Sequence, residues 1–339
     1  MRYLTAGESH GKALVGILEG MPAHIRISID KINEQLARRQ QGYGRGGRMS
    51  IESDAAEILS GVRGGITLGS PIAIIINNRD YENWSEVMCP VSGDWSKRPL
   101  TAVRPGHADL AGCVKYGFDD ARNVLERASA RETAMRVAVG AVCRQYLEQK
   151  GVEITSRVIS IGGVSGNSGI KAAIDKAKAD GDTLGGIAEV LIKGVPVGLG
   201  SYVHYDRKLD AAIAMHLMSI QSVKAVEIGL GVESAACKGS EVHDEMENKE
   251  QRPEIRKIRR KSNNAGGIEG GMSNGEDIVI RVSFKPIPTL MKGIDTVDIR
   301  TGKAVKAASE RSDVCAVEAG SVVAENVAAF VVADEFLRP

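Results

Sequence analysis

The chain has 339 residues, of which 43% are apolar and 26% are charged, and this balance excludes an intrinsically disordered protein. Its 44 lysines and arginines nearly equal its 43 aspartates and glutamates, so it lacks the basic excess expected of a protein built to bind nucleic acid. Aromatic residues make up only 4%, which argues against base stacking as its main means of binding.

The first half of the chain contains two predicted helices and one predicted strand. Residues 28–40 carry apolar side chains at helical spacing behind a serine that can cap the helix. The apolar run 72–77 follows a Gly-Ser-Pro turn and is typical of a buried strand. Residues 129–132 have the capping-box pattern, serine first and glutamate three positions later, and the helix that they open is expected to stop at Gly151.

The second half is predicted to be richer in strands. Residues 187–192 and 226–232 are apolar runs of strand length, and residues 276–284 alternate apolar with polar side chains. The chain is predicted to close with an amphipathic helix over residues 320–337. The most polar stretch, residues 238–261, is expected to be an exposed excursion.

One spacing of glycines and apolar residues occurs twice. Three glycines precede Ile72 at the same distances at which three others precede Ile278, and each isoleucine opens an alternating apolar run. The glycines are Gly64, Gly65 and Gly69 in the first half, and Gly270, Gly271 and Gly275 in the second. With 39 glycines in the chain, coincidence is one reading, and a duplicated α+β unit is the other. Because no Pro- or Ser-rich linker separates the halves, residues 1–339 are expected to form a single composite domain.

The cysteines and the apolar segments bear on location. Five cysteines lie far apart without a Cys-x-x-Cys pair, which predicts free thiols in a reducing compartment such as the cytoplasm. No apolar stretch reaches the ~18–20 residues of a membrane span, and the first residues lack the apolar segment of a signal peptide. We therefore expect no membrane partner.

An arginine-rich loop is the strongest candidate for an anion site. Arg38, Arg39, Arg45 and Arg48 fall within eleven positions, and the first acid after them is Glu52. Guanidinium groups bind phosphate and carboxylate with a planar fork of donors, and glycines let backbone N–H groups approach an anion closely. The loop is predicted to clamp a small, doubly anionic ligand; a solvated basic loop is the alternative.

Two glycine patterns superficially match nucleotide-binding loops. Gly42, Gly44 and Gly47 fit Gly-x-Gly-x-x-Gly, but they follow a predicted helix instead of a strand, so a Rossmann site is rejected. Residues 7–12 are one residue too short for a P-loop, and Ala13 stands where serine or threonine is required, which disfavours an ATPase.

Two histidines lie in glycine-bounded turns. His10 lies within residues 7–11, and His107 follows a Pro-Gly pair within residues 104–109. Histidine exchanges protons near neutral pH, so both are acid–base candidates, although a loop histidine can also be purely structural. The sequence has no His-Glu-x-x-His motif and no Cys/His cluster, so we expect no metal.

The chain resembles a known family through several motifs in a fixed order, and no single motif would be sufficient. The segments 7–11, 42–48, 104–109, 127–135, 264–275, 285–289 and 311–313 appear in the order found in chorismate synthases. The resemblance extends from about residue 7 to residue 337. It implies an α+β sandwich with helices packed between antiparallel sheets, assembled as a homotetramer.

The same resemblance implies a carbon–oxygen lyase acting on phosphates. Members of the family convert 5-enolpyruvylshikimate 3-phosphate to chorismate and phosphate by an anti-1,4-elimination, the last common step toward the aromatic amino acids. The reaction needs reduced FMN although it has no net redox change, so the cofactor supplies the difficult chemistry. NADPH is the candidate reductant of the flavin.

The resemblance also assigns roles to residues. His10 resembles the residue that protonates the departing phosphate, and His107 resembles the one that protonates the reduced flavin near N1. Asp313 resembles the carboxylate beside flavin N5, which Ser9 and Ser129 accompany. The substrate anions are expected to contact five arginines, namely Arg39, Arg45, Arg48, Arg104 and Arg131.

The flavin-binding stretches of the family match five parts of this chain. Ala128 departs from the family pattern, which commonly has serine there, so Ser129 is the remaining hydroxyl of its stretch. The matching residues are Arg127, Ala128, Ser129, Gln221, Ser222, Gly270, Lys285, Pro286, Ile287, Pro288, Thr289 and Arg311.

Two rival functions remain open at this point. A flavin-binding module without catalysis would keep the Gly270 and Lys285 stretches but would not need the arginine loop. A nucleic-acid binder could use the basic residues of segment 252–261, but the acids of segment 245–254 interleave with them, which favours a solvated surface.

Overall fold

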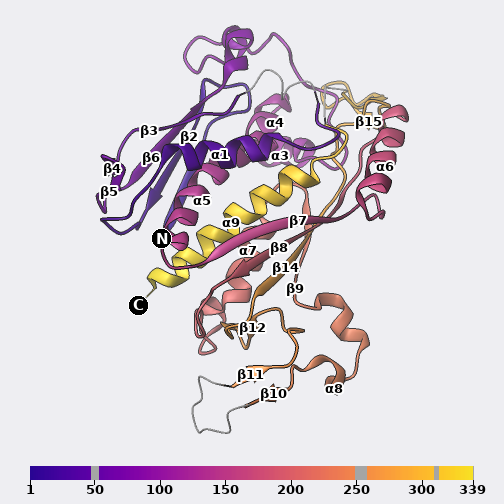
Figure 1. Cartoon of the computed structure of the whole chain (residues 1–339). Helices are drawn as coiled ribbons and strands as arrows, with labels where there is room; N and C mark the ends of the chain where they lie inside the picture. The colour runs from indigo at the N-terminus through magenta and orange to yellow at the C-terminus, as the bar shows by residue number, and fades with distance from the viewer. Residues whose placement is uncertain (47–52, 249–257, 309–312, 339) are drawn as a thin grey trace.

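Two antiparallel sheets enclose a layer of helices (Figure 1). The computed structural model describes residues 1–46, 53–248, 258–308 and 313–338. The first sheet has the strand order β1 (Arg2–Ala6), β2 (Ala13–Glu19), β6 (Ile72–Asn77) and β3 (Ala56–Ile58). The second has the order β7 (Glu153–Ile161), β8 (Gly186–Lys193), β14 (Ile278–Phe284) and β9 (Val223–Ile228). This α+β sandwich confirms the predicted fold class.

The third strand of each sheet shows why the sequence alternates. In β6, Ile72, Ile74 and Ile76 are buried, while the residues between them are only partly covered. In β14 the same period buries Ile278, Ile280, Val282 and Phe284. Since successive side chains of a strand point to opposite faces, each sheet turns one apolar face toward the helices.

Four helices fill the space between the sheets: α1 (Ile29–Gln40), α5 (Thr133–Glu148), α7 (Leu209–Met218) and α9 (Val317–Leu337). Helix α5 packs on the first sheet, α9 packs on the second, and α5 and α9 pack on each other. They cross closely at Gly140, where an added Cβ would lie 2.2 Å from the carbonyl oxygen of Asn326. Residues from both sheets and all four helices belong to one continuous apolar core.

The two halves repeat one order of elements, with insertions. A strand pair, a helix, an edge strand, a two-stranded hairpin, a central strand and a long helix occur first as β1 to α5 and again as β7 to α9. The hairpins are β4 (Val62–Arg63) with β5 (Ile66–Thr67), and β12 (Ile268–Glu269) with β13 (Met272–Ser273). Each turns on a glycine pair with positive φ, Gly64–Gly65 and Gly270–Gly271. The repeated order supports the duplicated unit and disfavours coincidence.

Shorter elements make the insertions and connections. Between β6 and α5 the chain forms η2 (Arg79–Asn83), α2 (Ser85–Met88), α3 (Asp109–Tyr116), α4 (Arg122–Ala128) and η3 (Ala130–Glu132). The second half adds α6 (Asn167–Ala179), η4 (Tyr205–Arg207), η5 (Gly231–Ala236), α8 (Gly239–Val242), β10 (Met246–Glu247), β11 (Arg259–Arg260), β15 (Asp295–Val297) and β16 (Ala304–Lys306).

Three sequence-based expectations for the elements need correction. The strand expected at 226–232 ends at Ile228, because Gly229 turns the chain so tightly against residue 264 that an added Cβ would lie 2.1 Å from the Asn264 carbonyl oxygen. The final helix is not amphipathic: nearly every residue of α9 is buried, because it packs against α1, α5, α7 and the second sheet.

The third correction concerns the capping box. Ser129 does cap the short η3 turn, since its Oγ accepts the backbone N–H of Arg131. The carboxylate of Glu132 does not return to Ser129. It accepts hydrogen bonds from Thr5 and Arg136, and the long helix begins at Thr133.

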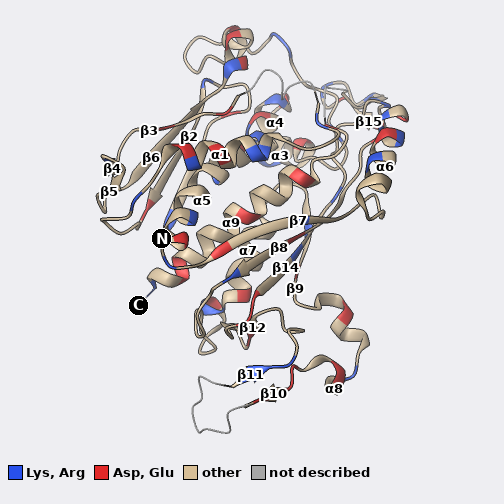
Figure 2. Cartoon of the chain, in the orientation of Figure 1, with Lys and Arg blue, Asp and Glu red and all other residues tan. Residues whose placement is uncertain are grey.

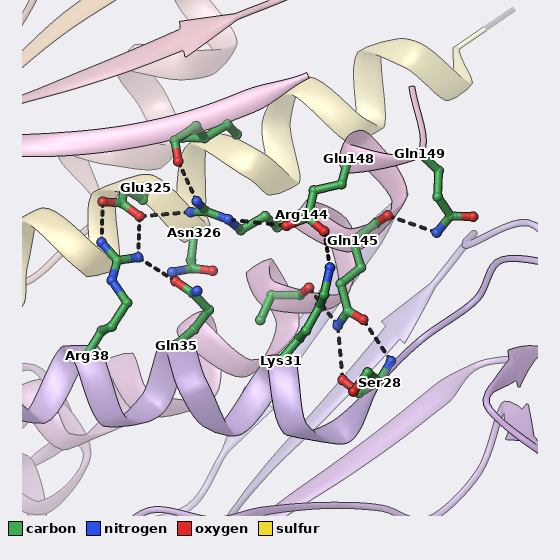
Figure 3. A network of polar contacts seen from close by, with 12 residues as sticks. Ser28, Lys31, Gln35, Arg38, Arg144, Gln145, Glu148, Gln149, Glu325 and Asn326 are labelled. Carbon is green, nitrogen blue, oxygen red and sulfur yellow. Dashed lines mark hydrogen bonds and ion pairs between the residues drawn. The ribbon is translucent and has the colours of Figure 1, made fainter. Parts of the chain in front are cut away.

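Charges of both signs are interspersed along the chain (Figure 2), as the near-zero net charge requires. One charged group lies in the centre of the helix layer. Glu325 of α9 is fully buried, and its carboxylate accepts hydrogen bonds from Arg38 of α1 and Arg144 of α5 (Figure 3). The hydroxyl of Ser156 on β7 also donates to this carboxylate, at 2.6 Å. In the part of the chain that the structure describes, no helix is long and apolar enough to cross a membrane.

Candidate active site

A cavity of about 440 Å³ receives residues from both halves of the chain. Its volume lies within the ~300–1,000 Å³ typical of small-molecule sites. Most of its charged groups come from segments 9–10, 39–46 and 104–108. Turn η3 adds Arg131, and the start of α5 adds the hydroxyl of Thr133. Apolar side chains from the second half also line it: Leu184, Ile220, Phe284, Ile287, Pro288, Val317 and Val323. A cavity lined by both charged and apolar side chains suits a ligand set with both anionic and planar apolar parts.

Four of the five predicted substrate arginines line this cavity: Arg39, Arg45, Arg104 and Arg131. The fifth, Arg48, lies outside the described residues. They come from α1, from the loop after it, from the turn before α3 and from η3. Folding therefore brings together guanidinium groups that are up to 92 positions apart in the sequence, from Arg39 to Arg131.

Two of these arginines share one buried carboxylate. Arg131 Nη1 donates to Asp54 Oδ1 at 2.5 Å, and Arg39 Nη1 lies 3.6 Å from Asp54 Oδ2. Arg39 also donates to Thr133 Oγ1 and to the Ala130 carbonyl, both at 2.9 Å. Burial is the main cause that lowers the pKa of Arg39, to about 10, so the side chain is still a cation at neutral pH.

Arg45 and Asp313 join the arginine loop to the segment before α9. Arg45 Nη1 lies 3.2 Å from Asp313 Oδ2, and the backbone N–H of Gly46 donates to Asp313 Oδ1 at 2.6 Å. The backbone N–H of Val314 donates to the Gly44 carbonyl at 2.8 Å. The loop is thus tied to a predicted catalytic carboxylate, and Arg311, the other charge of that motif, lies outside the described residues.

His107 is held by a buried acid. Its Nδ1 lies 2.5 Å from Oδ1 of Asp109, and Arg104 Nε donates to Oδ2 of the same carboxylate at 2.8 Å. Burial by itself raises the pKa of Asp109, but the hydrogen bonds from His107 and Arg104 outweigh it and hold that pKa well below its usual range. Arg104 also donates to Thr289 Oγ1 at 3.1 Å, which connects this group to the 285–289 turn.

His10 is held in the same manner by another acid. Its Nδ1 lies 2.9 Å from Oε1 of Glu126, a residue of α4 that is only 2% exposed. The imidazole stacks on Trp84, with 4.1 Å between ring centroids. Sequence reasoning missed Glu126, Trp84 and Asp54. No local pattern could have found them, because Glu126 and Trp84 lie more than 70 positions from His10, and Asp54 lies more than 70 positions from Arg131.

The predicted flavin stretches are brought to the cavity in part. Ala128, Ser129, Gln221, Ser222, Lys285, Ile287, Pro288 and Thr289 line it. Burial, followed by the nearby charge of Lys224, lowers the pKa of Lys285. Gln221 donates from Nε2 to Glu132 at 3.1 Å, while its buried Oε1 has no hydrogen-bond partner among the described residues.

Three described residues that were predicted for flavin binding do not line the cavity. Arg127 is directed to Thr5, donating to its carbonyl at 2.8 Å, and does not line the cavity. Gly270 lies in the turn of the β12–β13 hairpin, and Pro286 lies between lining residues without lining the cavity itself. Arg311 lies outside the described residues.

Other chemistry-bearing groups lie elsewhere. In the polar stretch 238–261, whose residues 249–257 lie outside the described part, Lys261 pairs with Glu245 and Arg260 pairs with Glu269. Searched over the described residues, the structure contains no group of three His, Cys, Asp or Glu side chains arranged to hold a metal ion.

Comparisons with known proteins agree on one family. The family model described as chorismate synthase matches residues 1–337. A chorismate synthase of Caldicellulosiruptor bescii is 53% identical, the alignment covering 100% of this chain and 94% of that protein. One of Caldanaerobacter subterraneus subsp. tengcongensis is 56% identical over 100% of this chain and 93% of that protein. A crystal structure of chorismate synthase superposes with a TM-score of 0.78 and 42% identity, covering 99% of this chain and 91% of that one. The chain therefore belongs to the chorismate synthase family, and it is an enzyme, a carbon–oxygen lyase acting on phosphates.

Proposed function

We propose that this cavity eliminates phosphate from 5-enolpyruvylshikimate 3-phosphate in an anti-1,4 sense to give chorismate, with reduced FMN as cofactor and no net redox change. The observation that carries the proposal is convergence. Four arginines and two carboxylate-backed histidines, from segments spread over the first 131 residues, line one cavity together with apolar residues of the second half. A flavin-binding module without catalysis would have no use for these arginines.

Charge matching supports the substrate. The proposed substrate carries one phosphate and two carboxylates, and guanidinium is the side chain best suited to both groups. Arg39 and Arg131 are oriented by Asp54, and Arg104 is oriented by Asp109, so their forks are held before the substrate arrives. Fixing them in advance reduces the side-chain entropy that binding would otherwise remove.

The residues present fit reduced FMN. The free acceptor Oε1 of Gln221 can receive an N–H of the flavin ring, Lys285 offers a cation, and Ile287 and Pro288 offer an apolar surface to a planar ring. Ala128, Ser129, Ser222 and Thr289 complete the proposed flavin contacts in the cavity. When bound, reduced FMN supplies transient electron donation to the substrate. Flavin roles for Arg127, Gly270, Pro286 and Arg311 stay predictions.

Side chains of the protein are proposed to donate and hold the protons of the reaction. We infer that His10 gives a proton to the departing phosphate, which becomes a better leaving group as its charge falls. His107, with Nδ1 held by Asp109, is proposed to hold a proton toward the flavin N1 side. Asp313, fixed by Gly46 and Arg45, is proposed to act as the carboxylate beside flavin N5. Ser9, whose backbone donates to the Glu126 carbonyl, and Ser129 are proposed to assist.

The assembly, location and reductant are also proposals. Leu4 and Ile17 face each other across β1 and β2 and are 69% and 43% exposed, and such an uncovered apolar pair on a sheet supports association into a homotetramer. The continuous core supports one domain over residues 1–339. The five cysteines, all free in the described chain, support a cytoplasmic location. NADPH is proposed as the reductant of the flavin.

An anaerobic assay tests the function. The full chain is mixed with 5-enolpyruvylshikimate 3-phosphate and dithionite-reduced FMN, and inorganic phosphate and chorismate are measured together. We expect equal amounts of both products, and no turnover with oxidised FMN. Folded protein that binds FMN but releases neither product would reject the proposal and favour the flavin-binding module.

A further inference from the structure

Glu126 makes more contacts with His10 than packing alone would require. The backbone N–H of His10 donates to Oε2 at 2.8 Å, and its Nδ1 lies 2.9 Å from Oε1 and 3.0 Å from Oε2. Arg122, one turn earlier on α4, donates to Oε1 at 3.2 Å. A single carboxylate therefore fixes both the main chain and the ring of His10.

The chemistry of these contacts determines where the ring carries its protons. Burial raises the pKa of Glu126, but the hydrogen bonds from His10 and the charge of Arg122 outweigh it, so the net shift is downward and the side chain remains a carboxylate. A carboxylate can only accept hydrogen bonds, so Nδ1 of His10 must carry a hydrogen. The ring nitrogen left for proton exchange is Nε2.

The remaining sides of the ring are also defined. Trp84 covers one face, and Arg98 and Arg122 lie over the Trp84 ring at 4.4 and 4.9 Å from its centroid. Within the described residues no hydrogen bond to Nε2 is recorded, and Oδ2 of Asp80, from η2, lies 3.9 Å from it. The charged groups that face His10 are thus Glu126, Asp80 and, one contact further, Arg122 and Arg98.

We propose that Glu126 is a positioning residue of this reaction, which holds Nδ1 of His10 so that Nε2 gives the proton to the departing phosphate. This inference rests on the proposed function. As the carbon–oxygen bond breaks, its electron pair leaves with the phosphate oxygen, the proton moves from Nε2 to phosphate, and the ring becomes neutral with its hydrogen on Nδ1. The negative charge of Glu126 stabilises the protonated ring before the step and retains the correct tautomer after it.

Nuclear magnetic resonance of the unmodified chain tests the tautomer without any turnover. The protein has six histidines, so ¹⁵N-histidine labelling with a His10→Gln variant for assignment isolates the His10 signals. We expect a protonated Nδ1 at every pH at which the protein is folded. A neutral His10 ring that is protonated at Nε2 alone overturns the proposal, whether or not the enzyme is active.

Variants test the consequence for the reaction. We expect Glu126→Gln to lower kcat by about 10- to 100-fold with KM changed less than threefold, and to alter the pH dependence of kcat. Glu126→Asp should recover part of the loss. The matched control is Glu189→Gln, a buried glutamate on β8 that pairs with Arg157 and Arg281, none of which lines the cavity.

The outcomes separate this proposal from the function on which it rests. If the wild type is active, three results would each overturn the role of Glu126. The first is a Glu126→Gln variant whose kcat has the wild-type pH dependence, and the second is a variant in which only KM changes. The third is a pH dependence that changes in Asp80→Asn and not in Glu126→Gln. An inactive wild type would overturn the proposed function while the tautomer measurement still decides the position of the proton. Circular dichroism checks folding, and if Glu126→Gln fails to fold, Glu126→Asp and the wild-type spectrum decide.

Discussion

Oδ1 of Asp109 lies 2.5 Å from Nδ1 of His107, and the Asp109 side chain is completely buried. The two residues are neighbours in one turn, yet the same carboxylate also accepts both Nε and Nη2 of Arg104. A proposed proton donor and a proposed anion ligand thus depend on one acid. Since a buried carboxylate in contact with a guanidinium stays ionised, it fixes both partners in one geometry.

Replacing this acid should separate positioning from binding. We expect Asp109→Asn to lower kcat by about 10²-fold or more, because the amide can present N–H toward His107 and favour the wrong tautomer. KM should rise as well, since Arg104 loses its charged partner. Anaerobic steady-state kinetics with reduced FMN measure both parameters. Asp298→Asn, a surface acid hydrogen-bonded to Thr101, is the control, and an Asp109→Asn enzyme with wild-type kcat contradicts the prediction.

The arginines should contribute to binding through geometry as well as charge. In Arg39→Lys the charge stays, but the fork that reaches Thr133 and Ala130 is lost. We expect the substrate Kd to rise about 10- to 100-fold, as loss of about 1.5–3 kcal/mol from a hydrogen-bonded charge implies. Isothermal titration with oxidised FMN present measures this Kd without turnover. Arg157→Lys, a 72% exposed side chain on β7, should leave it unchanged; equal Kd values for both variants would remove Arg39 from the substrate contacts.

The crossing of the two central helices should tolerate no side chain at its closest point. Alanine at Gly140 would place a Cβ 2.2 Å from a backbone oxygen of α9, and backbone cannot move aside as a flexible side chain can. We expect Gly140→Ala to lower the free energy of unfolding by about 2 kcal/mol or more, despite the better helix propensity of alanine. Gly239→Ala in α8, where the nearest atom is 3.7 Å away, is the control and should change it by less than about 0.5 kcal/mol. Equilibrium urea unfolding measures both; similar values would mean that α5 and α9 can separate at no cost.

Regular elements could be predicted from the sequence because their signal is local. The strand 72–77 matches β6 residue for residue, and α1 begins one position after the expected cap, since period and turn residues lie within each segment. The paired glycines at 64–65 and 270–271 left coincidence and a repeated unit both open, and the repeated order of elements favours the unit. The amphipathic character predicted for the final helix was wrong: even Glu325 is buried, and partly buried partners from α1, α5 and β7 satisfy its carboxylate.

Residues of the candidate site could be predicted only where they belong to a continuous sequence motif. His10, His107 and the arginines stand in glycine-rich segments that the family resemblance identifies, and their meeting in one cavity could not be derived from spacing. Asp109 lies within the motif of His107, but two other supporting acids could not be found: Glu126 is 116 positions from His10, and Asp54 is 77 positions from Arg131. Long-range pairing of this kind depends on how the sheets and helices pack, which no local pattern records.

The charge buried between the helices leads to the last prediction, a pH-dependent stability. Burial raises the pKa of Glu325, but the hydrogen bonds from Arg38 and Ser156 and the charges of Arg38 and Arg144 outweigh it, so the pKa lies below its usual value. A group whose pKa falls on folding stabilises the protein above its unfolded pKa, near ~4.3, and loses that contribution as the pH drops through the folded value. We therefore expect Glu325→Gln to be less stable than wild type at pH 7 by about 3 kcal/mol or more, because Arg38 and Arg144 lose their buried partner. The gap should narrow below about pH 5 and continue to narrow toward the folded pKa, which urea unfolding from pH 7 to about pH 3 measures. Glu245→Gln, an exposed partner of Lys261 outside this network, is the control. A gap that stays constant over this range would show that the glutamate acts through shape and not through its charge.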